Sequence, residues 1–323
     1  MRVIVTGGSG FIGTNLIELL LRHGHSVLNL DINPPRNEDH LPFWNETSLL
    51  DRDVLGSALA GFSPDVIYHL AARTDLNGTS LEDYEVNIGG TENLINEAAK
   101  IPSVSYVLFA SSRLVCRIGY QPKHDEDYCA STIYGESKVL SEQIVRSKCK
   151  GVGFKWALFR PTSIWGPWFD TPYREFFLSV LKRRYVHPKG LKISKSFGYV
   201  GNSVHILASL VENGVDDFHK KTFYLCDYPV IDVLDWANEI SSQVGSRPIV
   251  EVPLFLLRIV ARCGDLFHFI GWKNVPLTTF RLNNLLTPMP HETKFIEELI
   301  GDLPFSNSEG VSLTLSWLSK ERH

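Results

Sequence analysis

The sequence lacks the features that mark several large classes of protein. Its five cysteines are scattered, odd in number, and never spaced as CxxC. Zinc sites need clustered ligands and small secreted scaffolds carry denser cysteine, so we expect no metal site and reduced thiols in a cytoplasmic protein. The net charge is only −4 at pH 7, which gives no reason to expect nucleic acid as a partner.

The chain also lacks an unbroken apolar run long enough to cross a membrane. Its most apolar segment, residues 252–272, is interrupted by Arg258, Arg262 and Asp265. The helical spacing of its apolar residues predicts an amphipathic helix packed into the core, and an interfacial helix is the alternative. Residues 1–10 begin directly with a predicted strand and contain glycines, so we expect no signal peptide.

The sequence does contain a regular alternation of apolar strands and amphipathic helices through its first half. Such alternation is typical of a parallel sheet with right-handed crossovers and helices on both faces. We therefore predict an α/β fold with a doubly wound parallel sheet of the Rossmann type. The predicted strands cover residues 2–7, 26–31, 64–72, 103–112 and 154–161, and the predicted helices cover 11–24, 53–62, 80–100 and 131–149.

The pattern changes after about residue 160. Residues 160–177 carry three prolines and two tryptophans with little periodicity, and after a return to helix and strand over 200–228 the chain is mostly helical. Open α/β folds bind ligands at the carboxyl edge of the sheet, where we expect the later residues to form a smaller lobe. The predicted division is a cofactor domain of 1–160 with 196–228 and a mostly helical substrate-binding lobe of 161–195 with 229–323.

A glycine-rich loop joins the first predicted strand to the first predicted helix. The stretch VTGGSGFIG places Gly7, Gly10 and Gly13 in this loop. Glycines there allow a tight turn and close approach of the backbone to a pyrophosphate, which faces the positive end of the helix dipole. A purely structural turn is the alternative, but the strand–loop–helix context favours dinucleotide binding.

Asp31 ends the second predicted strand, eighteen residues after Gly13. A carboxylate at this position can bind the ribose 2′-hydroxyl of NAD and would repel the 2′-phosphate of NADP. The nearby Arg36 weakens this preference, and the alternative is that Asp31 only begins a turn.

The stretch YGESK places Tyr134 and Lys138 one turn apart near the start of a predicted helix. A free tyrosine has a pKa near about 10 and is a poor base at neutral pH, but a neighbouring ammonium and an oxidised nicotinamide both favour its phenolate. Such a tyrosine can take a proton from a substrate hydroxyl while hydride leaves the same carbon. A serine at the end of the strand over 103–112 would complete the group.

These motifs stand in a recognisable order: TGGSGFIG, Asp31, PDVIYHLAA, VNIGGTENLINEA, two serines near 111, YGESK and RPTSIWGP. In this order the chain resembles the extended short-chain dehydrogenase/reductases, and more narrowly the NAD-dependent nucleotide-sugar epimerase/dehydratase family. The resemblance covers residues 1 to about 228 well and the remainder loosely.

The resemblance implies a role for each matching residue. The catalytic serine is Ser112 rather than Ser111, Tyr134 is the base, and Lys138 holds the cofactor ribose. The residues implied at the NAD cofactor are Gly7, Gly10, Phe11, Ile12, Gly13, Asp31, Ile32, Leu70, Ala71, Ala72, Asn87, Tyr134, Lys138, Pro161 and Thr162.

The chain departs from the family pattern on the substrate side. Dehydratases of the family carry an Asp–Glu pair where this chain has Arg113 and Leu114, so dehydration is disfavoured. Arg113 either meets an anionic group of the substrate or pairs with an acid of residues 124–128. Lys195 replaces an arginine that would clamp a diphosphate, although lysine can still bind one as a point charge. The implied substrate-binding residues are Ser112, Arg113, Ser163 and Lys195.

The resemblance implies an NAD-dependent nucleotide-sugar 4-epimerase, in which carbon 4 is oxidised, the ketosugar turns, and hydride returns to the other face. A reductase or dehydrogenase acting on a ketosugar or another alcohol, including a sterol-like one, with NAD(P) exchanged at each turnover, is the first alternative. A non-catalytic NAD-binding regulator is the second, but it would not need Ser112, Tyr134 and Lys138 together. The resemblance also implies a homodimer that pairs residues 81–100 and 133–149 into a four-helix bundle.

Overall fold

A seven-stranded parallel sheet forms the centre of the computed structural model, which describes residues 1–214, 216–272, 275 and 277–321. The strand order is β11-β6-β5-β4-β1-β2-β3, and every neighbouring pair is parallel. This order confirms the predicted α/β fold with a Rossmann sheet. The strands are β1 (Arg2–Thr6), β2 (Ser26–Asp31), β3 (Trp44–Glu46), β4 (Val66–His69), β5 (Tyr106–Ala110), β6 (Lys155–Pro161) and β11 (Thr222–Leu225).

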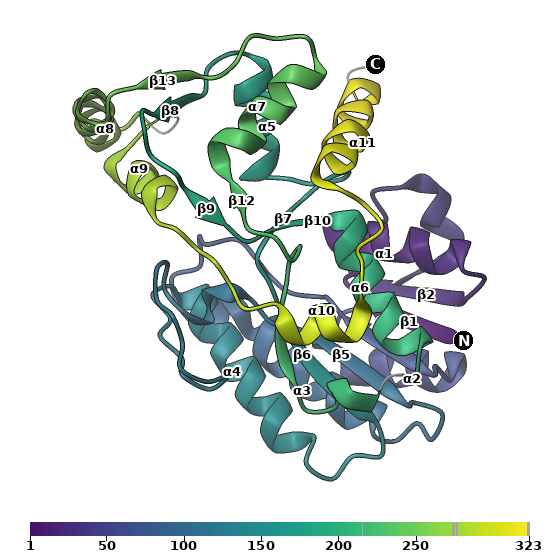
Figure 1. The fold of residues 1–323 in the computed structure, drawn as a ribbon. Coiled ribbons are helices and arrows are strands. Elements are labelled where there is room, and N and C mark those ends of the chain that lie inside the picture. Colours follow the sequence, from purple (N-terminus) through teal and green to yellow (C-terminus); the bar gives the residue numbers. More distant parts are fainter. Residues whose placement is uncertain (215, 273–274, 276, 322–323) are drawn as a thin grey trace.

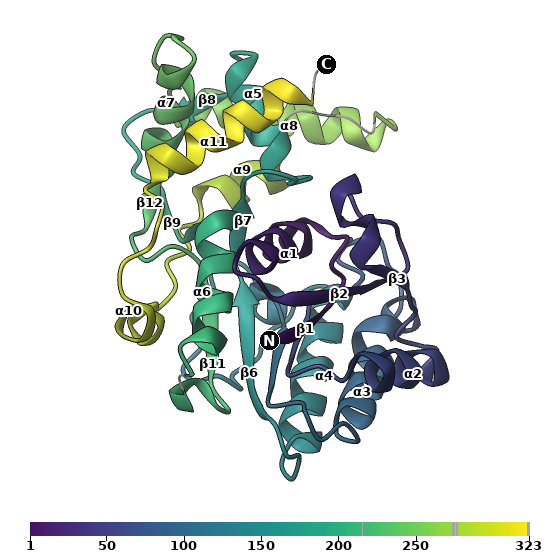
Figure 2. The ribbon, with the colours of Figure 1, turned by 90° about the vertical axis from the view of Figure 1, so that its right-hand side faces the viewer.

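Helices cover both faces of the sheet, because alternate strand residues point to opposite sides. Val3 and Val5 of β1 join the core under α1 and α6, whereas Ile4 joins the core under α2, α3 and α4. Figure 2 shows the two helical layers on either side of the strands. The helices are α1 (Phe11–Arg22), α2 (Arg52–Phe62), α3 (Glu85–Ala98), α4 (Ile133–Lys148) and α6 (Val200–Glu212).

Three predicted elements that border the site are shorter in the structure. The helix predicted over 80–100 becomes a 3₁₀ turn at Glu82–Tyr84 followed by α3. Strand β4 ends at His69 and β5 ends at Ala110, so the residues expected at the cofactor and the substrate follow the strands as loops. Loops at carboxyl strand ends are where open α/β folds place their ligands.

The rest of the chain forms a smaller, mostly helical region above the sheet in Figure 1. Its core is aromatic: the Trp236 ring lies 4.5 Å from Phe197, 4.8 Å from Phe176 and 5.3 Å from Trp165, centroid to centroid. The region contains α5 (Tyr173–Leu181), α7 (Val233–Gln243), α8 (Leu254–Phe269), α9 (Thr279–Leu286) and α11 (Asn307–Lys320).

Short strand pairs join distant parts of this region. They are β7 (Ser163–Trp165) with β10 (Phe197–Tyr199), β8 (Val186–Pro188) with β13 (Val250–Val252), and β9 (Ser194–Lys195) with β12 (Ile231–Asp232). One late helix, α10 (Lys294–Ile300), instead lies against α6 of the sheet domain. We therefore keep the predicted domain boundaries as a proposal, with α10 as the segment that returns to the cofactor domain.

The apolar segment 252–272 forms the predicted amphipathic helix, but the prediction that it packs into the main core is wrong. It forms α8, which buries only a narrow face through Leu257 and Ala261 against Leu282 of α9. Most of its other large apolar side chains are exposed. The helix is neither long nor apolar enough to cross a membrane, and the same holds for the other helices of the described residues.

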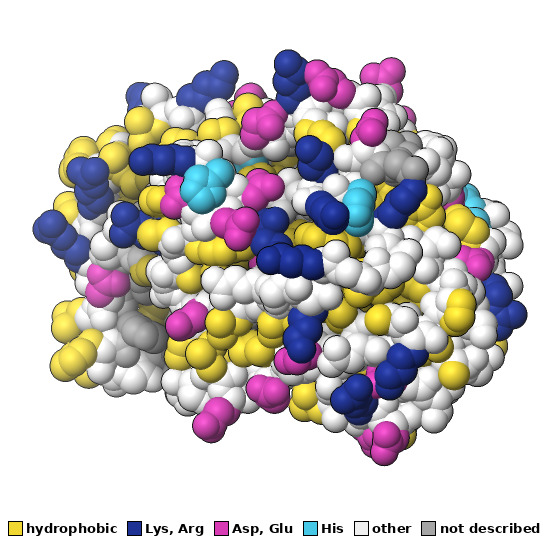
Figure 3. Space-filling model, turned by 90° about the horizontal axis from the view of Figure 1, so that it is seen from below, with side chains coloured by type: hydrophobic (Ala, Val, Ile, Leu, Met, Phe, Trp, Pro, Cys, Tyr) yellow, Lys and Arg dark blue, Asp and Glu magenta, His cyan; other side chains and the backbone are white. Residues whose placement is uncertain are grey.

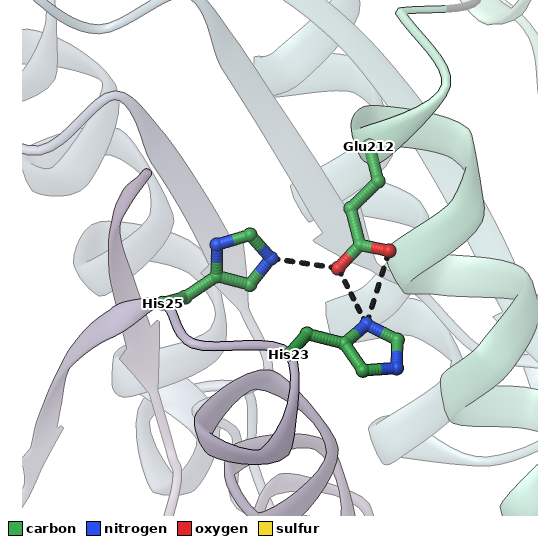
Figure 4. Close-up of side chains that lie close together, drawn as sticks. All are labelled: His23, His25 and Glu212. Carbon is green, nitrogen blue, oxygen red and sulfur yellow. Dashed lines mark hydrogen bonds and ion pairs between the residues drawn. The ribbon is translucent and has the colours of Figure 1, made fainter.

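A cluster of two histidines and a glutamate connects the ends of α1 and α6 near the amino end of β2, away from the carboxyl ends of the strands. Figure 4 shows His23, His25 and Glu212 directed toward one another. The Glu212 carboxylate lies 2.9 Å from His23 Nδ1 and 2.7 Å from His25 Nε2. Burial raises the pKa of Glu212 and the two histidines lower it, with a net downward shift, so the glutamate is ionised and fastens the two helices.

Candidate active site

The backbone conformation of the glycine loop is suited to binding a phosphate. Gly7 has φ +72°, and a Cβ there would lie 2.5 Å from the Ala71 backbone nitrogen; a Cβ on Gly13 would lie 2.4 Å from the Gly7 carbonyl oxygen. Neither position tolerates a side chain. Gly10 caps α1, and the amides of Phe11 and Ile12 follow in the first turn, where helix N–H groups have no partner within the helix. This end of α1 can hold a pyrophosphate.

Asp31 is fixed beside this loop by backbone amides. Its carboxylate accepts hydrogen bonds from Ser9 N at 3.1 Å and Asn33 N at 2.9 Å. Burial raises the pKa of Asp31, and these amides oppose the rise. Arg36, which weakened the preference for NAD, is paired with Asp170 at 2.5 Å. Its charge is thus already matched by Asp170, so the prediction that Asp31 selects NAD at the ribose is not weakened by Arg36; Ile32 is exposed beside Asp31.

Exchanging Asp31 for serine will shift cofactor preference from NAD toward NADP. The variant loses a charge-assisted hydrogen bond to the 2′-hydroxyl and the repulsion of a 2′-phosphate, so we expect NAD binding to weaken about tenfold to hundredfold. Titration calorimetry with each dinucleotide measures the effect. Asp39→Ser, which changes an exposed acid nearby, is the control, and equal weakening of both cofactors in Asp31→Ser would contradict the assignment.

The loop after β4 lies against the glycine loop and is held in place by hydrogen bonds to Thr6 of β1 and Asn87 of α3. Leu70 N and Ala71 N donate to Thr6, and Ala72 follows them. Asn87 of α3 is fully buried; its side chain bonds the Arg73 backbone at both N and O and also donates to Ser137 of α4. Asn87 therefore positions the loop after β4 through backbone contacts.

Ser112, Tyr134 and Lys138 meet at the carboxyl end of β5. All three are less than 9% exposed. Thr132 caps α4 by accepting from Gly135 N, which places Tyr134 in the first turn, where its hydroxyl hydrogen-bonds the Ser112 side chain. Lys138 Nζ donates to the Ala110 carbonyl oxygen at 2.9 Å. The structure thus brings the three predicted catalytic side chains together.

Burial sets the protonation of this group. It raises the pKa of Tyr134 to about 12, which the hydrogen bond with Ser112 opposes, and it lowers the pKa of Lys138 to about 8. The lowering of the Tyr134 pKa expected from Lys138 does not appear, since the ammonium is directed at Ala110. Tyr134 therefore needs a further positive group beside it to act as a base.

A buried ion pair between Glu142 and Arg160, which we did not predict from the sequence, joins α4 to β6 beside the catalytic group. Glu142 of α4 accepts from Arg160 Nε and Nη2 of β6 at 2.8 Å each, and from Tyr128 OH at 2.9 Å. Ser111 Oγ donates to the same carboxylate at 2.5 Å, so the two adjacent serines have different partners. The sequence could have indicated Glu142, because Tyr134, Lys138 and Glu142 recur every four residues and therefore share one helix face.

The side of the site predicted to face the substrate carries two cations close together, Arg113 and Lys195. The charge of Arg113, after burial, lowers the pKa of Lys195 to about 8, and Lys195 Nζ donates to the Asn284 carbonyl oxygen of α9 at 2.6 Å. Arg113 does not pair with residues 124–128: its Nη1 lies 3.3 Å from Met289 Sδ. Among the described residues neither Arg113 nor Lys195 forms an ion pair.

The remaining predicted site residues, Pro161, Thr162 and Ser163, lie at and just after the carboxyl end of β6. Pro161 ends β6, and Thr162 donates to the Leu225 carbonyl oxygen. Ser163 is buried, and its hydroxyl accepts from Tyr173. His291, missed by the sequence analysis, stacks on Tyr224 and lines a small cavity with Arg113 and Met289. Burial and then Arg113 lower its pKa to about 4, so it is neutral.

A Rossmann sheet with a glycine loop, a ribose-directed acid and a Ser–Tyr–Lys group defines a class of dinucleotide-dependent enzymes that move hydride to or from an alcohol carbon. The sequence pattern of the NAD dependent epimerase/dehydratase family matches residues 3–226, and the chain belongs to this family. The structural class and the family confirm NAD as the cofactor of this kind of protein.

Relatives within the family have diverse substrates. The chain is 32% identical over 270 residues to a 3 beta-hydroxysteroid dehydrogenase/Delta 5-->4-isomerase of Mycobacterium tuberculosis, covering 76% of this chain and 70% of that one. It is 24% identical to an N-acetyl-alpha-D-glucosaminyl-diphospho-ditrans,octacis-undecaprenol 4-epimerase of Escherichia coli, covering 98% and 94%. The fold matches UDP-glucuronic acid 4-epimerase of Bacillus cereus with TM-score 0.74 at 16% identity, covering 99% and 100%.

Proposed function

We propose that the protein is an NAD-dependent 4-epimerase of a sugar carried on a diphosphate, with a nucleotide sugar as the first candidate substrate. The observation that carries the substrate class is the pair of cations, Arg113 and Lys195, close together with no ion-pairing acid among the described residues. Two buried or half-buried cations need an anion, and a diphosphate supplies it. Arg113 directly follows Ser112, so this anion site adjoins the proposed catalytic group.

The proposed residues have defined tasks. Bound NAD supplies a hydride acceptor that can also return the hydride, and its oxidised ring supplies the positive charge that favours the Tyr134 phenolate. Tyr134 takes the proton of the substrate hydroxyl, and Ser112 holds the same oxygen. Lys138, with a pKa lowered by burial to about 8, donates to the ribose, and the positive charge beside Tyr134 comes from the oxidised ring. Arg113 and Lys195 hold the diphosphate while the ketosugar turns.

Net oxidation or reduction of an alcohol, with NAD(P) exchanged at each turnover, is the second candidate. It is favoured by the relative at 32% identity, which is named as a hydroxysteroid dehydrogenase. The same three residues serve both reactions, so the fate of the hydride distinguishes them. Dehydration remains disfavoured, because Arg113 and Leu114 stand where a dehydratase would need acids.

The hydride test uses a UDP-hexose deuterated at carbon 4 and the purified protein. We expect the epimer to form without added cofactor, to keep the deuterium, and to release no NADH. A keto product that forms only with added NAD(P), with one deuterium-labelled reduced cofactor per turnover, would instead support the dehydrogenase. Lys195→Met should raise KM about tenfold to hundredfold through loss of a charge-assisted contact, and Lys192→Met, on the exposed residue nearby, should not.

We further propose that two copies pair through α3 and α4, as the resemblance implies. These two helices lie side by side on one face of the sheet. Val139, Leu140 and Ile144 of α4 are only partly buried in the single chain, which supports an apolar contact with a second copy.

A further inference from the structure

The outer face of α8 is apolar and exposed. The buried side chains of the helix, Leu257 and Ala261, point to α9, whereas Ile259 is 54% exposed, Leu266 62% and Phe269 89%. At 3.6 residues per turn the exposed apolar residues form one continuous stripe on the side away from the protein. This docking face consists of Phe255, Leu256, Ile259, Val260, Leu266 and Phe267, with Phe269 at its margin. The exposed Ile270 and Trp272 follow the helix, and the Trp272 ring lies 5.3 Å from that of Phe267.

Basic residues border the docking face on one side. Arg258 and Arg262 lie four residues apart on one edge of the apolar stripe, both exposed. Among the described residues neither forms an ion pair, and the one acid of the helix, Asp265, is hydrogen-bonded to Thr279. Figure 3 shows hydrophobic and basic side chains next to one another on the left, the side on which α8 lies in Figure 1.

We propose that α8 docks the protein on an anionic lipid surface. An apolar stripe with arginines at its edge and aromatic residues at its end is the pattern of a helix lying in the plane of a membrane interface. The helix does not meet the length or apolarity needed to span a bilayer, which is consistent with a position at the surface. Anionic headgroups would neutralise both arginines while the acyl region receives the stripe.

A second copy of the chain is the other possible occupant, and charge disfavours it. In a symmetric contact the same face meets itself, so the arginines of both copies would border one seam. The face offers no acid to pair with them, because Asp265 is engaged by Thr279. Lipid phosphate supplies the missing negative charge.

The docking face is connected to the substrate side through one helix. α8 lies along α9, and the Asn284 carbonyl oxygen of α9 accepts from Lys195 Nζ at 2.6 Å. After α9 the chain runs to Met289, whose sulfur contacts Arg113. The bound surface would therefore lie one helix away from the two cations.

Vesicle flotation of the full chain tests this proposal without any substrate. We expect binding to an equal mixture of phosphatidylcholine and phosphatidylglycerol, weaker binding to phosphatidylcholine alone, and loss of the difference at high salt. Ile259→Ser with Leu266→Ser should weaken binding about tenfold or more for each side chain. Leu313→Ser, an exposed leucine on α11, is the matched control and should bind like the parent protein.

The arginines and the oligomeric state complete the test. Arg258→Gln with Arg262→Gln should weaken binding to the anionic vesicles about fivefold for each arginine and leave binding to phosphatidylcholine unchanged. NAD binding and circular dichroism confirm that each variant is folded. Absence of vesicle binding overturns the proposal, and a molar mass by light scattering that falls in Ile259→Ser with Leu266→Ser assigns the face to a second copy instead.

Discussion

The Tyr134→Phe variant will transfer hydride about 10²- to 10⁴-fold more slowly than the parent protein while still binding NAD. The substitution removes only the hydroxyl that bonds Ser112, and phenylalanine fills the same buried space. Stopped-flow measurement of NADH formation, or of label exchange in an epimerase assay, gives the rate. Fluorescence titration gives the NAD affinity.

The pH dependence follows from the same group. Because burial raises the pKa of Tyr134 to about 12, the hydroxyl is protonated at neutral pH, and the fraction of phenolate grows as pH rises. Hydride transfer in the parent protein should therefore speed up from about pH 6 to about pH 8, and the residual rate of Tyr134→Phe should not. Tyr106→Phe, at the other end of β5, is the control. Activity that survives intact in Tyr134→Phe would leave the protein as an NAD-binding regulator.

Replacing Glu142 by glutamine will destabilise the folded protein by about 3–5 kcal/mol. Glutamine has nearly the same shape, but it leaves Arg160, which is 1% exposed, without its counter-charge. It also removes one of the two carboxylate oxygens that receive Ser111, Tyr128 and Arg160. Urea unfolding measures the change, and we expect the midpoint of thermal unfolding to fall by roughly 10 °C.

The exposed Glu136 on the same helix provides the matched control for Glu142. Glu136→Gln removes the same charge from the first turn of α4 and should cost less than about 1 kcal/mol. If the two variants unfold alike, the buried pair with Arg160 contributes no more than a surface charge, and the site is supported by other contacts.

The sheet and the glycine loop could be predicted from the sequence because both depend on residues that lie close together in the chain. Strand β2 begins and ends at the predicted residues, and Gly7 and Gly13 stand where no Cβ fits. The spacing of Tyr134 and Lys138 likewise fixes a shared helix face. The choice of Ser112 over Ser111 stays a prediction, although the two hydroxyls do have different partners, Tyr134 and Glu142 respectively.

Features that depend on contacts distant in sequence could not be predicted in the same way. The contact of Arg113 with Met289 could not be predicted, because Met289 lies far along the chain on the connection from α9. Helical periodicity in α8 correctly indicated an amphipathic helix. It could not show that only the narrow face with Leu257 and Ala261 is buried and that the wider apolar face is exposed. Burial of a stripe depends on which neighbours the chain brings to it, and only the folded structure supplies them.

The interleaved strand pairs of the smaller region have a consequence for biosynthesis. β8 pairs with β13 more than sixty residues later, and α11, made after both strands, brings Trp317 against Trp168 and Phe169. During translation the sheet domain can form its mostly local contacts first, while residues 161–195 wait for partners still unsynthesised. The nascent chain therefore exposes the aromatic core around Trp165 at least until α7 and α11 have left the ribosome, and in that interval it is open to misassembly.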